Sequence, residues 1–158
     1  MGTQARLTVD VARLDQGGER YAGELAEGVL DLSDSEILAP SGGIVYDLRV
    51  QLLGSELLVR GTLRQRLTCV CVRCAADFET EAAETGFVTS VEISDGIDFI
   101  DLTEEVREAI ILALPGYPVC REDCKGLCMT CGVNLNKATC SCREAGRGDR
   151  WAALDTLM

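Results

Sequence analysis

Cysteine is the residue type in this 158-residue chain whose chemistry and spacing say most, and there are nine cysteines. Eight of them fall in close pairs, separated by one to three residues. Two thiolates this close can reach the same metal ion, and zinc is commonly held in this way. Because the total is odd and the pairs are close, a metal explains the pattern better than disulfides do. The eight candidate ligands are Cys71, Cys74, Cys120, Cys124, Cys128, Cys131, Cys140 and Cys142.

The last four cysteines predict one complete metal site. Cys128-Met-Thr-Cys131 is followed by Gly132, which tolerates the positive φ of such a knuckle. After eight intervening residues, Cys140-Ser-Cys142 supplies two more thiolates. The chain between the pairs is short and turn-prone enough to fold back, so four ligands can close a tetrahedral site.

The two remaining pairs, which begin at Cys71 and Cys120, predict a second site. An isolated dithiolate holds zinc poorly, so the economical solution is that the two pairs meet, which gives two zinc ions per chain. Such a site would fasten the end of a strand to the chain that follows a helix, and would stabilise the fold. Spacing alone leaves another partition open, in which one site uses Cys120, Cys124, Cys128 and Cys131 and the other cysteines are free.

The absence of histidine from the chain bears on what these sites do. A catalytic zinc keeps an open position and usually has His or carboxylate ligands, so closed structural sites are favoured. Two alternatives remain: a redox role for the Cys71 pair, which would need a low-pKa thiol at a helix N-terminus, and an iron–sulfur cluster. No carboxylate constellation or glycine-rich phosphate loop is recognisable. We therefore predict no catalytic residue, no enzymatic activity and no small-molecule substrate.

The elements that must position the cysteines follow from hydrophobic periodicity. Apolar residues alternate over 44–52 and again over 57–67, which predicts a β-hairpin whose second strand ends near Cys71. Cys69 shares the parity of the buried positions and is predicted to be a core thiol rather than a ligand. Further strands are predicted near Leu7–Val11, around 25–32 and within 75–92.

One helix is predicted between the hairpin and the last cysteines. Asp101 and Glu104 have the spacing of a capping box, and apolar residues recur at helical spacing over about 102–114. Its second half is apolar nearly all round, which predicts a helix buried against the sheet, and Pro115 ends it shortly before Cys120.

Together these elements predict an α+β fold. It consists of a mainly antiparallel β-sheet or partly open barrel, one core helix and a C-terminal cysteine-rich zinc module. The expected division is a β-rich core over 1–116, a zinc-binding module over 117–143 packed on that core, and a short tail over 144–158.

Composition limits where the chain is expected to be located and which partners it is expected to bind. No run of eighteen apolar residues exists, and acids interrupt the first thirty positions, so neither a membrane span nor a signal peptide is predicted and a cytoplasmic location is expected. The formal net charge is −11, which is unlike a typical nucleic-acid binder. The acids are concentrated in residues 75–116, which hold eleven acidic residues and one basic residue.

The cysteine segments resemble the YceD family of large ribosomal RNA subunit accumulation proteins. The resemblance is carried by Cys120-Arg-Glu-Asp-Cys124-Lys-Gly-Leu-Cys128-Met-Thr-Cys131-Gly-Val-Asn-Leu-Asn, by Cys140-Ser-Cys142, by Cys71-Val-Arg-Cys74 and by the helix from Asp101 to Pro115. It covers residues 44–142, with Met129 and Ala75 as departures from common family residues. Relatives that lack the distal cluster and carry histidines at positions 120 and 124 imply that these two positions belong with Cys71 and Cys74.

The resemblance also implies a function. It implies a bacterial, non-enzymatic factor in large ribosomal subunit biogenesis that supports accumulation of 23S ribosomal RNA. A ribosomal protein or a pre-ribosomal large-subunit particle is then the expected partner, and the acidic surface of 75–108 could engage a basic protein.

Two other hypotheses remain open. The chain could be a zinc-ribbon protein that binds ribosomal RNA directly, or a thiol or zinc-transfer protein. The basic residues available for contact with RNA or a partner are Arg60, Arg64, Arg66, Arg73, Lys125 and Lys137.

Overall fold

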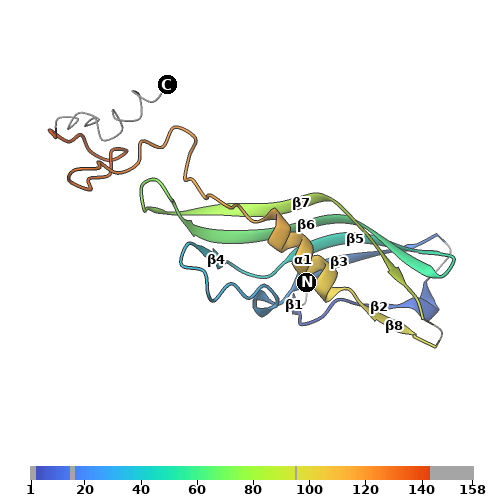
Figure 1. Cartoon of the computed structure of the whole chain (residues 1–158). Helices are drawn as coiled ribbons and strands as arrows, with labels where there is room; N and C mark the ends of the chain where they lie inside the picture. The colour runs from blue at the N-terminus through green and yellow to red at the C-terminus, as the bar shows by residue number, and fades with distance from the viewer. Residues whose placement is uncertain (1–2, 15–16, 95, 143–158) are drawn as a thin grey trace, which may run out of the picture.

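A curved sheet with a helix packed against it forms the body of the protein. The computed structural model describes residues 3–14, 17–94 and 96–142 (Figure 1). Over these residues a six-stranded, mainly antiparallel sheet forms a half-barrel, and α1 (Thr103–Ala113) is its one α-helix. The predicted α+β class is therefore confirmed.

The sheet has the order β1-β3-β5-β6, with β7 on the other side of β6 and β4 continuing the edge that β5 occupies. A separate two-stranded sheet pairs β2 with β8. The strands of the large sheet are β1 (Thr3–Gln4), β3 (Glu19–Leu25), β4 (Leu38–Pro40), β5 (Val45–Leu53), β6 (Glu56–Val70) and β7 (Asp77–Glu92). The small sheet consists of β2 (Thr8–Asp10) and β8 (Phe99–Asp101), and two 3₁₀ turns span Val11–Arg13 and Glu27–Val29.

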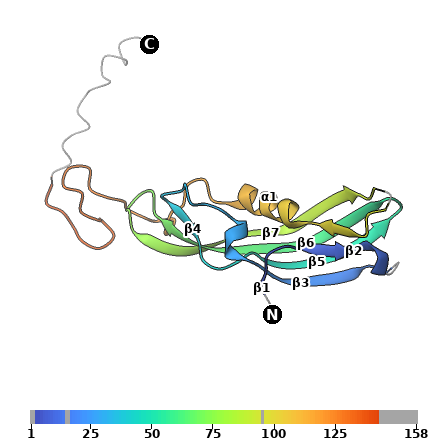
Figure 2. The ribbon, with the colours of Figure 1, turned by 90° about the horizontal axis from the view of Figure 1, so that it is seen from below.

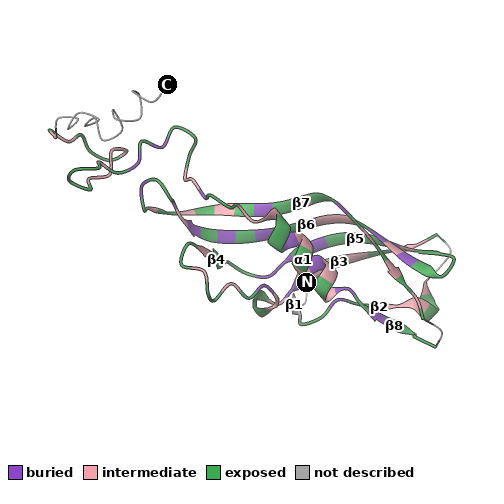
Figure 3. Ribbon diagram, in the orientation of Figure 1, coloured by how far each residue is buried: buried purple, intermediate pink, exposed green. Residues whose placement is uncertain are grey.

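The predicted hairpin is confirmed as β5 and β6, joined by a turn in which Gly54 has a φ of 64°. Inward and outward residues alternate along both strands, as the buried and exposed colours in Figure 3 show. The expected burial of Leu52 is wrong: this side chain is 38% exposed, although Leu57, which stands opposite it on β6, is fully buried. Cys69 is buried beside Leu67 and Ala82, as strand parity predicted.

Residues 77–92 form a single long strand, β7, which pairs along most of β6. The register shifts by one residue between Gly61 and Leu63, and the extra residue lies in β7 near Gly86. At the shift β5 passes very close to β6, because a Cβ on Gly61 would lie 2.1 Å from the carbonyl oxygen of Asp47. Glycine is therefore the residue that fits this position.

Helix α1 packs on β7 and β6 through one face only (Figure 2). Val106 and Ile110 are fully buried, which confirms the predicted packing of the helix against the sheet, but Leu112 is 80% exposed, so the apolar second half is not covered all round. Helical periodicity could not show that the sheet covers one side alone. The capping box is also absent: the side chain of Asp101 accepts a hydrogen bond from the backbone N–H of Thr103 (2.9 Å).

No helix among the described residues is long and apolar enough to cross a membrane.

The N-terminal segment closes one side of the half-barrel. Val9 of β2 is fully buried, and β2 agrees with the strand predicted near Leu7–Val11. The strand predicted around 25–32 is wrong, because β3 ends at Leu25 and a 3₁₀ turn follows. Leu25 and Leu30 are both buried although the chain between them is not a strand.

The close approach at Gly61 gives a test of the fold. We expect Gly61→Ala to lower the free energy of unfolding by about 2 kcal/mol or more, because the new methyl group overlaps the Asp47 carbonyl. Gly86→Ala is the matched control on β7, since its Cβ would meet only the flexible Glu84 side chain at 3.5 Å. It should change the free energy by less than about 1 kcal/mol. Urea denaturation followed by circular dichroism measures both, and equal losses would contradict the packing described here.

Candidate metal centres

The first cysteine cluster forms where the end of β6 meets the chain after α1. β6 ends at Val70, and the following turn carries Cys71 and Cys74. The chain leaving α1 is tied to this turn by a hydrogen bond from the backbone N–H of Val72 to the Pro118 carbonyl (3.0 Å). This contact brings in the remaining two cysteines. The ligand atoms of Cys71, Cys74, Cys120 and Cys124 all lie within 4.8 Å of one another.

The sulfur separations fit a tetrahedral metal. Four thiolates about 2.3 Å from a zinc ion are about 3.8 Å apart. The sulfurs of Cys71 and Cys124 are 3.9 Å apart, and those of Cys74 and Cys120 are 3.7 Å apart. A disulfide would need about 2.05 Å, and all nine cysteines are free thiols here. The cluster can therefore hold a metal ion.

Hydrogen bonds to sulfur favour the thiolate form in this cluster. Burial opposes charge on Cys71, but backbone N–H groups, that of Cys120 foremost, outweigh it and lower the pKa of Cys71 to about 6. For Cys124, burial is likewise outweighed by hydrogen bonds, chiefly from the Asn136 amide (3.3 Å), and its pKa is lowered. Burial and hydrogen bonds with its neighbouring thiols raise the pKa of Cys120 to about 12. A divalent cation would supply the charge that lets all four ionise.

The second cluster lies further along the chain. Its ligand atoms, from Cys128, Cys131, Cys140 and Cys142, also lie within 4.8 Å of one another. Hydrogen bonds from the backbone N–H groups of Cys131 and Thr130 lower the pKa of Cys128 to about 6. The pKa of Cys142 is raised to about 12, first by its hydrogen bond with Cys131 and then by burial and charge repulsion. The donor set is again four sulfurs, which suits zinc.

The turns at Cys71 and Cys128 have the same backbone design. In each, the residue after the second cysteine has a positive φ, 52° at Ala75 and 73° at Gly132. Each of these residues also donates its N–H to the carbonyl of the first cysteine, at 2.8 Å and 2.9 Å. The positive φ predicted at Gly132 is thus confirmed, whereas Ala75 adopts the same conformation with a side chain that disfavours it.

A short segment between the ligand pairs of the second cluster contacts the first. The amide of Asn134 donates to the Cys74 carbonyl (3.3 Å), and that of Asn136 donates to the Cys124 sulfur (3.3 Å). The Asn136 side-chain oxygen also accepts from the backbone N–H of Lys125 (2.8 Å). Sequence reasoning missed both asparagines, and their spacing of two within Asn-Leu-Asn was the only available signal.

The clusters differ in exposure. Cys71, Cys74 and Cys124 are buried, and they pack with Val119 and Phe78. In the second cluster Cys131 is exposed, and Met129 at the tip of its turn is fully exposed. Figure 1 shows this part of the chain extending beyond the end of the sheet. Whether residues 117–143 form a module distinct from the core stays a prediction, and the predicted tail over 144–158 lies outside the described residues.

The arginines proposed for RNA contact lie on the face of the sheet that points away from the core. Arg60, Arg64 and Arg66 are exposed on that face of β6. In the strand register Arg60 stands opposite Arg49 of β5, which in turn stands opposite Arg20 of β3. Sequence reasoning missed this row, because β3 could not be paired with β5 from the sequence.

Several of these arginines have intramolecular partners. Arg20 forms a two-point salt bridge with Asp47 (2.7 Å for each contact), which lowers the pKa of that carboxyl. Arg64 lies 3.6 Å from Glu81 on β7. Asp47 and Glu81 thus offset part of the positive charge on this face of the sheet.

The three basic residues near the cysteines differ in their contacts. Arg73, between the first two cysteines, donates to the carbonyls of Glu122 (3.2 Å) and Cys124 (3.5 Å), so it helps to hold the first cluster together. Lys125 and Lys137 are exposed. Their role in contact with RNA or a partner stays a prediction.

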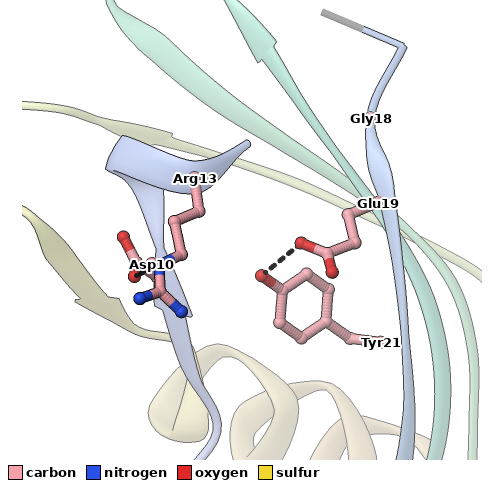
Figure 4. A pocket seen from close by; sticks show the side chains of 5 residues that line it. All are labelled: Asp10, Arg13, Gly18, Glu19 and Tyr21. Carbon is pink, nitrogen blue, oxygen red and sulfur yellow. Dashed lines mark hydrogen bonds and ion pairs between the residues drawn. The ribbon is translucent and has the colours of Figure 1, made fainter. Parts of the chain in front are cut away.

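A polar pocket lies away from the cysteine clusters. It is lined by Asp10, Arg13, Gly18, Glu19 and Tyr21 (Figure 4). Its polar groups are engaged with one another: Arg13 lies 3.3 Å from Asp10, and the Tyr21 hydroxyl donates to Glu19 (3.1 Å). Burial and this hydrogen bond raise the pKa of Tyr21 to about 12. The pocket therefore presents no activated nucleophile or base.

Comparison with known proteins places these clusters in context. A sequence model of the family described as "Large ribosomal RNA subunit accumulation protein YceD" matches residues 59–158. An uncharacterized protein of Mycobacterium tuberculosis is 31% identical over 184 residues, which cover 96% of this chain and 81% of that protein. A chloroplastic "Large ribosomal RNA subunit accumulation protein YCED homolog 1" of Zea mays is 44% identical over 45 residues, 28% of this chain and 15% of that protein. No solved structure matches.

The two related turns give a matched test of the site. Gly132→Ala should weaken metal binding at the second cluster about tenfold, because a Cβ there meets nothing within 4 Å and the full cost is left-handed backbone strain of about 1–2 kcal/mol. Ala75→Gly removes that strain from the first cluster, so metal binding there should be unchanged or slightly tighter. Competition with a chelator, followed by cobalt absorption, measures both. Weaker binding in the Ala75→Gly variant would contradict the assigned conformation.

Proposed function

The chain belongs to the YceD family of large ribosomal RNA subunit accumulation proteins, and from that premise we propose that it acts in large ribosomal subunit biogenesis as a non-enzymatic factor supporting 23S ribosomal RNA accumulation. The observation that carries the proposal is the family match over residues 59–158, a segment that contains both cysteine clusters. A chloroplast relative that matches 28% of this chain is named for the same process. Such a role implies a cytoplasmic location.

Two structural zinc ions are part of this proposal. Cys71, Cys74, Cys120 and Cys124 would hold one, and Cys128, Cys131, Cys140 and Cys142 the other. Support comes from all-sulfur donor sets, from sulfur separations near those of a tetrahedral site, and from hydrogen bonds that favour thiolates. A zinc ion with four protein ligands keeps no open position, so its contribution would be to fix the chain. That is the reason for proposing a non-enzymatic role.

The proposed partner is a ribosomal protein or a pre-ribosomal large-subunit particle. The strongly acidic segment of residues 75–116 favours a basic protein over a nucleic acid as the direct contact. Direct binding of ribosomal RNA is the second candidate, and the row formed by Arg20, Arg49 and Arg60 favours it. A thiol or zinc-transfer role is the weaker alternative, supported only by the exposure of Cys131.

Metal content tests the zinc assignment. The purified chain should carry two zinc ions, and Cys74→Ser and Cys131→Ser should each carry one, because each removes a ligand from a different cluster. Cys69→Ala is the control and should keep two, since Cys69 packs with Leu67 and Ala82 and belongs to neither cluster. Native mass spectrometry gives the stoichiometry and elemental analysis identifies the metal. One ion in the wild-type chain, or iron in place of zinc, would refute the assignment.

Ribosomal RNA levels test the function. Deleting the gene in its host should lower the ratio of 23S to 16S ribosomal RNA, and the wild-type gene should restore it. The Cys74→Ser variant should fail to restore the ratio, whereas Cys69→Ala, at matched protein level, should restore it. Quantification of total ribosomal RNA by capillary electrophoresis measures the ratio. An unchanged ratio after deletion would count against the proposed function.

A further inference from the structure

A groove of about 320 Å³ runs between β7 and α1. Both views show α1 lying beside β7, and contacts between the two confirm it (Figures 1 and 2). The groove is formed from the helix by Glu105, Glu108, Ala109 and Leu112, and from the strand chiefly by Glu84 and Val88. It is separate from both cysteine clusters.

Helix α1 therefore has two distinct stripes. Leu102, at its N-cap, and Val106 and Ile110 recur every four residues and are buried in the core. The groove residues 105, 108, 109 and 112 also follow helical spacing, and so share a second face. This second face combines two acids with two apolar residues: Ala109 is half-buried and also packs against the core, whereas Glu108 and Leu112 are exposed.

The apolar part of the groove is exposed to an unusual degree. The side chain of Leu112 is 80% exposed and that of Val88 is 62% exposed, although both line the same groove. Phe87, which is buried, also lines it. Large apolar side chains grouped on a surface and flanked by polar residues are typical of interaction sites.

The charged part of the groove is acidic throughout. Glu84, Glu105 and Glu108 contribute three carboxylates, and no basic residue lines the groove. One oxygen of Glu105 is buried and has no hydrogen-bond partner among the described residues. A buried carboxylate oxygen without a partner is unfavourable, and a cationic group entering the groove would satisfy it.

We propose that this groove is the docking site for a basic peptide segment of a partner protein, one that carries an apolar side chain next to an arginine or lysine. The apolar side chain packs on Leu112 and Val88, and the cation pairs with Glu105 and Glu108. RNA is the disfavoured occupant, because three carboxylates repel phosphates. The inference deepens the proposed function, on which it rests for the setting in which the chain meets a basic protein.

Binding of a synthetic peptide to the purified full-length chain tests the groove. The probe is a fluorescein-labelled octapeptide that alternates arginine with leucine, and fluorescence anisotropy measures its affinity. Leu112→Ala should weaken binding about tenfold through lost apolar contact, and Glu105→Gln should weaken it about tenfold through loss of a desolvated charge pair.

Neighbouring residues on the same helix supply the controls. Ile111→Ala changes an adjacent exposed apolar residue that does not line the groove, and Glu104→Gln removes an acid one turn away from Glu108. Both should leave the affinity within about twofold of the wild type. An all-arginine octapeptide should bind more weakly than the alternating one, because it lacks the apolar side chain.

Three results would overturn the proposal: no binding of the alternating peptide at low salt, equal losses in the groove variants and their controls, or tighter binding of a single-stranded RNA octamer that Leu112→Ala weakens. Failure here is distinguishable from failure of the proposed function. If the peptide does not bind but gene deletion still lowers 23S ribosomal RNA, the groove assignment alone is wrong. If the groove binds as expected but deletion leaves 23S unchanged, the ribosomal role alone is wrong.

Discussion

Repulsion among crowded thiolates is the constraint on which the C-terminal third of the structure depends. Each cluster brings four cysteine sulfurs within 4.8 Å of one another. Hydrogen bonds lower the pKa of Cys71 and Cys128 to about 6, whereas burial first raises that of Cys120, and the hydrogen bond with Cys131 first raises that of Cys142, to about 12. Four close thiols therefore do not all ionise by themselves, whereas a divalent cation offsets the repulsion. β4 to β7 supply no strand partner to the described chain after α1, so metal binding at the two clusters would contribute much of the order of that segment.

The half-barrel carries two different surfaces: a basic face of the sheet and an acidic, partly apolar groove beside α1. The face of the sheet that points away from the core carries arginines of β3, β5 and β6, and Asp47 and Glu81 offset part of their charge. The groove beside α1 carries carboxylates and exposed apolar side chains. A chain with a net charge of −11 can thus present a basic strip to one partner and an acidic groove to another. A large-subunit assembly intermediate offers both RNA and basic proteins.

Local patterns predicted the hairpin and the cysteine groupings well, because each depends on residues close in sequence or on a chemical type that few residues share. Alternation fixed which residues of β5 and β6 face the core, and it separated Cys69 from the other cysteines. The errors arose where the environment came from distant chain. The exposure of Leu112 depends on how far β7 extends over α1, and the row of Arg20, Arg49 and Arg60 depends on a pairing of β3 with β5. Neither the exposure of Leu112 nor this arginine row produces a periodic pattern within one segment of the sequence.

The asparagines between the two clusters show why the two sites should be treated as coupled. Asn134 and Asn136 lie within the second cluster's intervening chain, but they donate to the Cys74 carbonyl and the Cys124 sulfur of the first. Gly126 also approaches the turn of the first cluster closely, because an added Cβ there would come 3.1 Å from the Arg73 carbonyl oxygen. Ordering one cluster therefore places the groups that stabilise the other, and a coupling free energy of this kind acts equally in both directions. The exposed second cluster and the buried first one are therefore stabilised by the same amount when both are ordered.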